Sequence, residues 1–189
     1  MLIAVALFWG MSDTTFGATK QFSELESAGD IKVPSSSSYG FSFLKNGKWI
    51  VRVNDVEYGP YDAYTQGSLT FSQDGESFGF FLTNNTKQYA NINGREFWSY
   101  DSMSDLKFFG DSTTYSFRFV RGGKNYINIS GKEYGEYDQI QNAYFSEDGK
   151  TFGFTYTKWG KWYININGQE YGESYENAGN IYIAKDGKR

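Results

Sequence analysis

The chain has 189 residues, and 39% of them are hydrophobic and 20% aromatic, which is enough to build a folded core and excludes a disordered protein. The 18 Lys and Arg residues are outnumbered by 22 Asp and Glu residues and form no basic cluster, so a nucleic-acid-binding surface is excluded. Because the chain contains no histidine and no cysteine, Ser-His-Asp, Cys-His and zinc chemistry are excluded as well.

The N-terminal segment begins with an apolar run from Leu2 to Met11. This run is shorter than the ~20 apolar residues of a transmembrane helix, so we expect no stable membrane span. It has the length of the apolar region of a secretory signal, although no basic residue precedes Lys20. We therefore interpret residues 1–17 as signal-peptide-like and residues 18–27 as a lead-in, and we expect a secreted or periplasmic protein. The alternative is that the run forms a buried strand of the folded domain.

The rest of the chain repeats one unit. An aromatic-small-aromatic triplet marks it, and its first residue recurs at steps of 78 − 39 = 39, 115 − 78 = 37 and 152 − 115 = 37 residues. A constant period of this size indicates stacked or radial repeats, in which no unit buries its apolar surface alone. The four triplets are Tyr39-Gly40-Phe41, Phe78-Gly79-Phe80, Tyr115-Ser116-Phe117 and Phe152-Gly153-Phe154.

Within each unit, apolar and polar residues alternate with a period of two, which predicts strands. In the fourth unit the strands are expected near 143–146, 151–157, 162–167 and 169–172, with turn residues such as Asn167-Gly168 between them. Four-stranded antiparallel units of this length are typical of β-propeller blades. We therefore predict an all-β fold, a β-propeller-like array of four four-stranded blades. The expected blades are 29–67, 68–105, 106–142 and 143–179, followed by the first strand of a fifth at 180–189.

The number of strands of each type bears on closure. The pattern contains five first strands, near Ile31, Leu69, Phe108, Tyr144 and Ile181, and only four sets of the other three. A closed ring needs equal numbers. We therefore expect an open arc, or a piece of a larger propeller, with an exposed blade edge through which the protein can self-associate.

Two stretches resemble a known family. Phe71-Ser72-Gln73-Asp74-Gly75 and Phe145-Ser146-Glu147-Asp148-Gly149 are each followed by an aromatic strand and then a strand similar to Gly-Lys-Trp-Tyr. This pattern resembles the repeats of TolB-like, WD-repeat-related bacterial propellers, and the resemblance extends from about Gly29 to the end. It implies a secreted or periplasmic interaction propeller and supplies no catalytic residues.

The Tyr-Asp pairs are the candidate binding residues, because they fall on the connections between blades, where loops of propellers reach the surface. Two interpretations stay open: hydrogen bonding between blades, and binding of a partner along this rim. Trp159, in a hairpin turn, is a further candidate. The pairs are Tyr61-Asp62, Tyr100-Asp101 and Tyr137-Asp138.

Two other features have structural and functional interpretations. Asp74 and Asp148 are expected to form structural turns, because neither is followed by the run of alternating carboxylates that a calcium loop requires. The many aromatic residues, Trp49 and Trp162 among them, are expected to pack in the core or at blade edges, or to offer a stacking platform for a carbohydrate.

Taken together, the sequence predicts a non-enzymatic interaction scaffold with a protein partner and with no cofactor, metal ion or catalytic residue. One alternative is a carbohydrate-binding propeller that uses surface aromatic residues. A second is a non-catalytic propeller part of a larger enzyme. Glycoside hydrolysis needs two converging carboxylates, and the spacing singles out no pair among Asp62, Glu136, Asp138 and Glu173.

Overall fold

The computed structural model describes residues 27–35, 38–110, 112–179 and 181–184. The signal-like segment 1–17 lies outside the described residues, and so does the lead-in up to residue 26. The described part of the chain contains no helix of the length and apolarity needed to cross a membrane.

Four antiparallel sheets follow one another along the chain, and we call them blades 1 to 4. Blade 1 contains β1 (Ser27–Ser35), β2 (Ser38–Lys45), β3 (Lys48–Val53) and β4 (Val56–Tyr61). Blade 2 contains β5 (Ala63–Tyr64), β6 (Thr70–Phe71), β7 (Phe78–Asn84), β8 (Lys87–Ile92) and β9 (Arg95–Tyr100). Blade 3 contains β10 (Ser102–Phe109), β11 (Thr114–Arg121), β12 (Lys124–Ile129) and β13 (Lys132–Tyr137). Blade 4 contains β14 (Gln139–Phe145), β15 (Phe152–Lys158), β16 (Lys161–Ile166) and β17 (Gln169–Tyr175).

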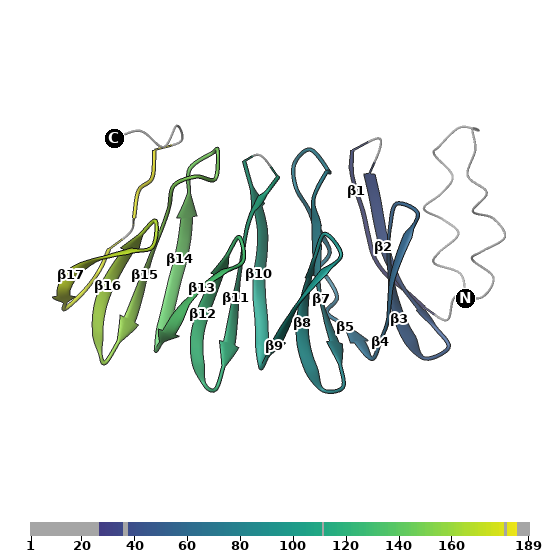
Figure 1. Cartoon of the computed structure of the whole chain (residues 1–189), viewed down its shortest axis with the longest axis horizontal. Helices are drawn as coiled ribbons and strands as arrows, with labels where there is room; N and C mark the ends of the chain where they lie inside the picture. The colour runs from purple at the N-terminus through teal and green to yellow at the C-terminus, as the bar shows by residue number, and fades with distance from the viewer. Residues whose placement is uncertain (1–26, 36–37, 111, 180, 185–189) are drawn as a thin grey trace.

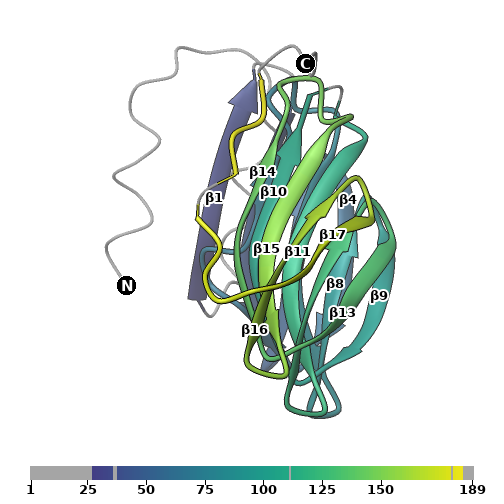
Figure 2. The same ribbon diagram turned by 90° about the vertical axis from the view of Figure 1, so that its left-hand side faces the viewer.

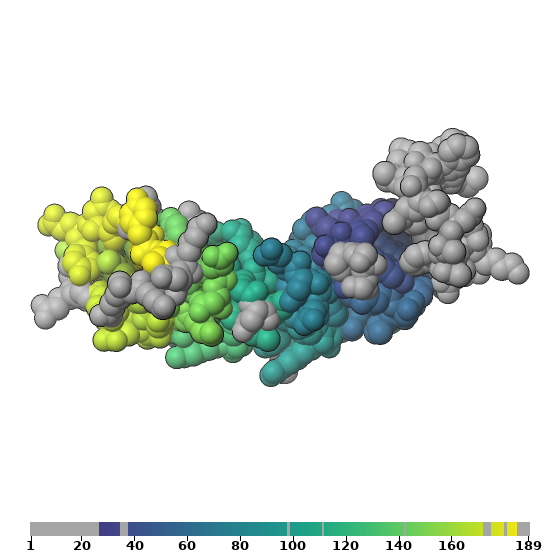
Figure 3. Space-filling model, turned by 90° about the horizontal axis from the view of Figure 1, so that it is seen from above, coloured from purple at the N-terminus to yellow at the C-terminus, as the bar shows by residue number. Residues whose placement is uncertain are grey.

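The blades stand side by side in an open row. Figure 1 shows blade 1 at one end and blade 4 at the other, with the strands of each sheet in sequence order. Figure 2 looks along this row, where successive sheets stand behind one another, and Figure 3 shows a long, curved body with blades 1 and 4 at opposite ends. The predicted all-β, β-propeller-like array of four blades is therefore confirmed, and so is the open arc.

The strand boundaries differ in detail from the expected ones. The first strands start at Ser27, Ala63, Ser102 and Gln139, a few residues before the expected blade starts. In blades 2, 3 and 4 this is because the first strand follows the preceding Tyr-Asp pair almost directly. Residues 181–184, the described part of the expected fifth first strand, contain no strand.

The first strand of blade 2 is divided into β5 and β6, which both pair with β7. Between them the chain turns away from the sheet at Gly67, whose N–H donates to both carboxylate oxygens of Asp30 in blade 1 at 2.8 Å. The hydroxyl of Tyr64 donates to the same carboxylate at 2.5 Å. Through these bonds the Gly67 N–H and the Tyr64 hydroxyl of the interrupted strand have polar partners, and blade 2 is bound to blade 1.

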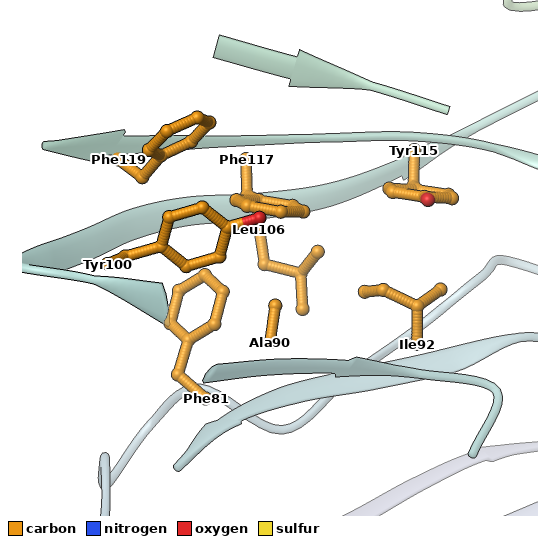
Figure 4. Close-up of a cluster of buried hydrophobic side chains, with 8 residues drawn as sticks. All are labelled: Phe81, Ala90, Ile92, Tyr100, Leu106, Tyr115, Phe117 and Phe119. Atoms are coloured by element: carbon orange, nitrogen blue, oxygen red, sulfur yellow. The ribbon is translucent and has the colours of Figure 1, made fainter. Parts of the chain in front are cut away.

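The core consists of one aromatic cluster at each junction between blades. Figure 4 shows the cluster between blades 2 and 3, in which Phe117 has no exposed surface and meets Phe81 edge to face at 6.0 Å between ring centroids. Equivalent clusters lie at the other two junctions, around Phe80 and around Phe154. The apolar face of a blade is therefore buried by its neighbour, as the repeat pattern predicts.

Small residues in the aromatic strands permit this close packing. A side chain at Gly79 would bring its Cβ to 2.9 Å from Leu106 Cδ2, in the first strand of blade 3. A Cβ at Gly40 would lie 3.1 Å from Leu69 Cδ2 in blade 2. The leucine of one blade therefore occupies the space above the glycine of the blade before it.

Candidate functional site

The turns that join the second and third strands of each blade project from one side of the row, the lower side in Figure 1. We call this side the lower rim. It consists of four turns together with the aspartates that follow blades 1, 2 and 3. These are the turns 45–48, 84–87, 121–124 and 158–161, and Asp62, Asp101 and Asp138.

Each rim aspartate accepts a hydrogen bond from the turn of the next blade. The carboxylate of Asp62 accepts from the N–H of Asn85 at 2.6 Å. Equivalent bonds run from the N–H of Gly122 to Asp101 and from the N–H of Trp159 to Asp138, both at 2.8 Å. The aspartates therefore tie the last strand of one blade to the hairpin of the following blade.

Two of the aspartates also bind a lysine of their own blade. Asp62 pairs with Lys48, and Asp138 pairs with Lys124 at 2.5 Å between Nζ and Oδ1. The hydrogen bond from the lysine is the main reason that the pKa of each carboxyl lies below its usual value. At neutral pH both carboxylates are ionised.

The tyrosines of the three pairs lie inside the junctions. Tyr61, Tyr100 and Tyr137 are 5%, 3% and 4% exposed. The hydroxyl of Tyr61 donates to Glu96 of blade 2 at 3.0 Å, and that of Tyr100 donates to Glu133 of blade 3 at 3.2 Å. Burial is the main cause that raises the pKa of all three tyrosines. The structure thus shows the Tyr-Asp pairs hydrogen-bonded between blades, with only the aspartates at the surface.

Trp159 is placed differently from the tyrosines. Its side chain is 80% exposed, while its backbone N–H is held by Asp138, and the ammonium of Lys158 lies 4.6 Å from the centre of its ring. At the corresponding turn positions of the other blades stand Asn46, Asn85 and Gly122. Trp159 therefore gives blade 4 a large apolar group on the lower rim that the equivalent turns of blades 1 to 3 do not have.

The other two tryptophans of the stacking hypothesis are less accessible. Trp49 is half-buried at the junction between blades 1 and 2, with its ring 5.7 Å from that of Tyr64. Trp162 is half-buried on blade 4. Trp49 therefore packs, whereas Trp159 offers a flat exposed surface for stacking.

The Asp-Gly turns are held by hydrogen bonds from protein groups. The carboxylate of Asp74 accepts from Ser112 of blade 3, from Ser72 Oγ at 2.7 Å and from the N–H of Glu76 at 3.0 Å. These bonds, with the one from Ser112 first, lower the pKa of Asp74 to about 2. Asp148 accepts from Ser146 Oγ at 2.6 Å. Both aspartates thus have the role in turns that the sequence indicates.

A shallow cavity of about 290 Å³ lies between β10, β11 and β12, beside Ile140. Its single acidic lining residue, Asp105, is paired with Arg118, whose Nε donates to it at 2.7 Å. Nowhere in residues 27–35, 38–110, 112–179 and 181–184 do three or more His, Cys, Asp or Glu side chains gather so as to hold a metal ion.

The comparisons with known proteins give only distant similarities. No protein-family model matches the chain, and no curated protein matches it in sequence. The similar solved structures include TolB from Acinetobacter baumannii, at 14% identity and a TM-score of 0.42, matched over 73% of this chain and 41% of TolB. The β-propeller domain of the Trilobed protease from Pyrococcus furiosus has 12% identity and a TM-score of 0.45, over 85% of this chain and 61% of that domain. A structure from a study of two prolyl endopeptidases matches at 12% identity and a TM-score of 0.45, over 76% of this chain and 28% of that one.

Proposed function

We propose that this protein is a non-enzymatic scaffold outside the cytoplasm, which binds a protein partner along the lower rim at Trp159. The observation that carries the proposal is the 80% exposed indole of Trp159, fixed at its backbone by Asp138. Tryptophan is over-represented among residues that dominate binding energy in protein interfaces. A large aromatic side chain on a fixed turn also loses little conformational entropy on binding.

The ionisable groups of the rim support a binding role over a catalytic one. Asp62, Asp101 and Asp138 each accept hydrogen bonds from the next turn, and lysines pair with the first and third of them. A carboxylate held in this way is poorly placed to act as a general base or nucleophile, because its oxygen atoms are already occupied by hydrogen bonds from the protein. The extracellular or periplasmic location rests on the sequence of residues 1–17.

The experiment compares partner capture by the wild-type chain, Trp159→Ala and Tyr182→Ala. Tyr182 is 90% exposed and lies outside the lower rim, so it is a matched control for loss of an exposed aromatic side chain. We expect wild type and Tyr182→Ala to retain the same partner from a secreted or periplasmic extract, and Trp159→Ala to bind it about tenfold or more weakly. Recovery of no partner at micromolar concentration, or equal capture by Trp159→Ala, would contradict the proposal.

A carbohydrate ligand is the second candidate, since an indole with a cation beside it also stacks on sugar rings. A glycan array with the same three proteins distinguishes the two candidates. Binding by wild type that disappears in Trp159→Ala supports a glycan ligand. If the wild-type protein binds no glycan on the array, the carbohydrate candidate is excluded and the proposal of a protein partner is unaffected.

A further inference from the structure

The four turns of the lower rim are rich in positive charge. They contain 7 of the 18 Lys and Arg residues of the chain and none of its 22 Asp and Glu residues. With the three rim aspartates the balance on the rim is 7 − 3 = +4, whereas the whole chain has a net charge of −4. The turns are 37 to 39 residues apart, so these cations form no cluster in the sequence. They are Lys45, Lys48, Lys87, Arg121, Lys124, Lys158 and Lys161.

The opposite side of the row, where the first strand joins the second and the third joins the fourth, has the reverse balance. Charge separated in this way attracts an anionic partner to the lower rim and repels it from the other side. The described turns on that side contain Asp55, Asp74, Glu76, Glu147 and Asp148, against a single cation, Lys150.

The rim cations differ in whether a carboxylate of the chain binds them. Two lysines bind rim aspartates, and the guanidinium of Arg121 binds Glu133 at 3.0 Å. Among the described residues, no carboxylate forms an ion pair with Lys87, Lys158 or Lys161. These three lysines can therefore bind an anionic group without breaking an ion pair of the chain.

The turn 158–161 joins two of these lysines to the exposed indole of Trp159. The ammonium of Lys158 lies 4.6 Å from the centre of an indole ring that is 80% exposed, and Lys161 is exposed as well. Glu176 follows blade 4 as the rim aspartates follow the other blades, but within the described part of the chain it forms no ion pair with Lys161. A carboxylate bound here meets two cations, and an apolar group beside it meets the indole.

We propose that the partner segment that binds the lower rim is an acidic, extended stretch of protein. One of its carboxylates lies at Lys87 in blade 2, and another, next to an apolar side chain, lies at the turn 158–161 in blade 4. The inference rests on the proposed binding at Trp159, and it adds the charge and the length of the partner segment.

The length of the segment follows from the spacing of the blades. Packed sheets are about 10 Å apart, so two junctions separate the turns of blades 2 and 4 by about 20 Å. An extended chain rises about 3.3 Å per residue, so about six residues span this distance. The two acidic positions of the partner should therefore be about six residues apart.

The rim aspartates favour a protein segment over a uniformly charged polymer. Asp101 and Asp138 bind the turns of blades 3 and 4, so they lie along the rim between Lys87 and the exposed indole. A polymer with an anion in every unit would bring negative charge to both aspartates, and like charges in contact weaken binding. A protein segment can place carboxylates at the lysines and uncharged residues at the aspartates.

The first test selects ligands from a phage library of random twelve-residue peptides on the immobilised wild-type chain. We expect the selected peptides to be enriched in Asp and Glu relative to the library, with two acidic positions about six residues apart. Trp159→Ala should not retain these peptides, because the apolar part of the contact is lost.

The second step compares two double variants that lower the net charge equally. Lys87→Gln with Lys161→Gln removes two charges from the rim and leaves Lys158 beside the indole. Lys32→Gln with Lys107→Gln, the control, removes two exposed lysines from the first strands of blades 1 and 3. For a synthetic copy of the most enriched peptide, the rim variant should raise the Kd about three- to tenfold, and the control should leave it unchanged.

The possible failures distinguish this inference from the proposed function. Peptides that need Trp159 but are not acidic, or equal weakening by both double variants, would overturn the acidic partner and leave binding at Trp159 intact. If wild type selects no peptide, or Trp159→Ala retains the same peptides, the proposed binding is contradicted and the acidic partner with it.

The salt dependence of association gives a second readout. Between about 0.01 M and about 1 M salt the Debye length falls from about 30 Å to about 3 Å, so the association rate of the peptide should fall about tenfold or more. A rate that does not change with salt would contradict the inference. Polygalacturonate is the competing polyanion: if it binds wild type more tightly than the peptide and loses binding in Lys87→Gln with Lys161→Gln, the rim binds an acidic polysaccharide and the proposal of an acidic protein segment is overturned.

Discussion

Phe117 is the residue at which we expect the packing between repeats to contribute most clearly to stability. It has no exposed surface, and it lies between the rings of blades 2 and 3 at 5.8 Å from Tyr100 and 6.0 Å from Phe81. Replacement of a fully buried phenylalanine by alanine costs about 3–5 kcal/mol, since both the transfer free energy and the contacts around the cavity are lost. Because domains are stable by only about 5–15 kcal/mol, Phe117→Ala should remove a large part of the free energy of unfolding.

The control is Phe41→Ala, at the same repeat position in blade 1, where the side chain is half-buried. Urea unfolding of both variants, followed by far-UV circular dichroism and tryptophan fluorescence, measures the difference. With a slope of about 2 kcal/mol/M, Phe117→Ala should lower the midpoint by about 2 M, and Phe41→Ala by about half of that or less. Equal shifts would refute the view that the junction between blades 2 and 3 stabilises more than the front of blade 1.

Three more predictions follow from single contacts. The pKa of Asp74 is about 2 in the folded chain and about 4 in the unfolded chain, so its stabilising effect is complete above about pH 4 and is lost as the pH falls to about 2. In the Asp74→Asn variant, the midpoint of urea unfolding should therefore depend less on pH in that window than it does in wild type. The junction tyrosines Tyr61, Tyr100 and Tyr137 have raised pKa values, so their contribution to stability should be complete below about pH 10 and be lost as the pH rises further. Ultraviolet titration alongside circular dichroism would detect this loss as simultaneous ionisation and unfolding. Gly79→Val should lower the melting temperature, because the valine side chain would collide with Leu106. The control Gly179→Ala should leave the melting temperature unchanged, because no atom lies within 4 Å of the new Cβ. Equal melting temperatures for the two variants would contradict the packing at Gly79.

Much of the fold could be predicted because the repeat pattern occurs four times in the chain. One copy of an alternating aromatic strand is ambiguous, whereas the triplets beginning at Tyr39, Phe78, Tyr115 and Phe152 fix the period and the faces together. The division of β5 from β6 was not predictable in this way. It depends on Asp30, a residue 37 positions away from Gly67, and the alternation of apolar residues carries no information on such a bond.

The blade boundaries were less predictable than the strands. The first strand of each blade has weak apolar alternation at its start, as in Ser102–Ser104, so the pattern locates the strand only at its more apolar end near Phe108. Backbone pairing begins earlier, with Ser102 opposite Val120. A strand is defined by its hydrogen bonds, and polar residues at a sheet end make these bonds without leaving a hydrophobic signal.

The partners of the Tyr-Asp pairs were missed although the sequence contained a signal for them. Glu96, Glu133 and Glu170 recur at 133 − 96 = 37 and 170 − 133 = 37 residues, in step with the tyrosines. Two sets of polar residues that share a period are candidates for a bond between neighbouring repeats. The structure shows these bonds at the first two junctions, from Tyr61 to Glu96 and from Tyr100 to Glu133.

The same reasoning separates structural residues from candidate binding residues on the lower rim. A group that stabilises a junction has to recur wherever the junction recurs, as the rim aspartates do after blades 1, 2 and 3. A group that binds one partner has no such requirement. Trp159 stands at a turn position whose counterparts are Asn46, Asn85 and Gly122, and the left-handed backbone there, with φ 54° at Trp159, favours asparagine or glycine. A bulky exposed residue held in that conformation costs stability in the isolated chain, so Trp159→Gly should stabilise the fold while it removes the proposed binding. A variant that loses both stability and partner capture would show that Trp159 belongs to the core architecture after all.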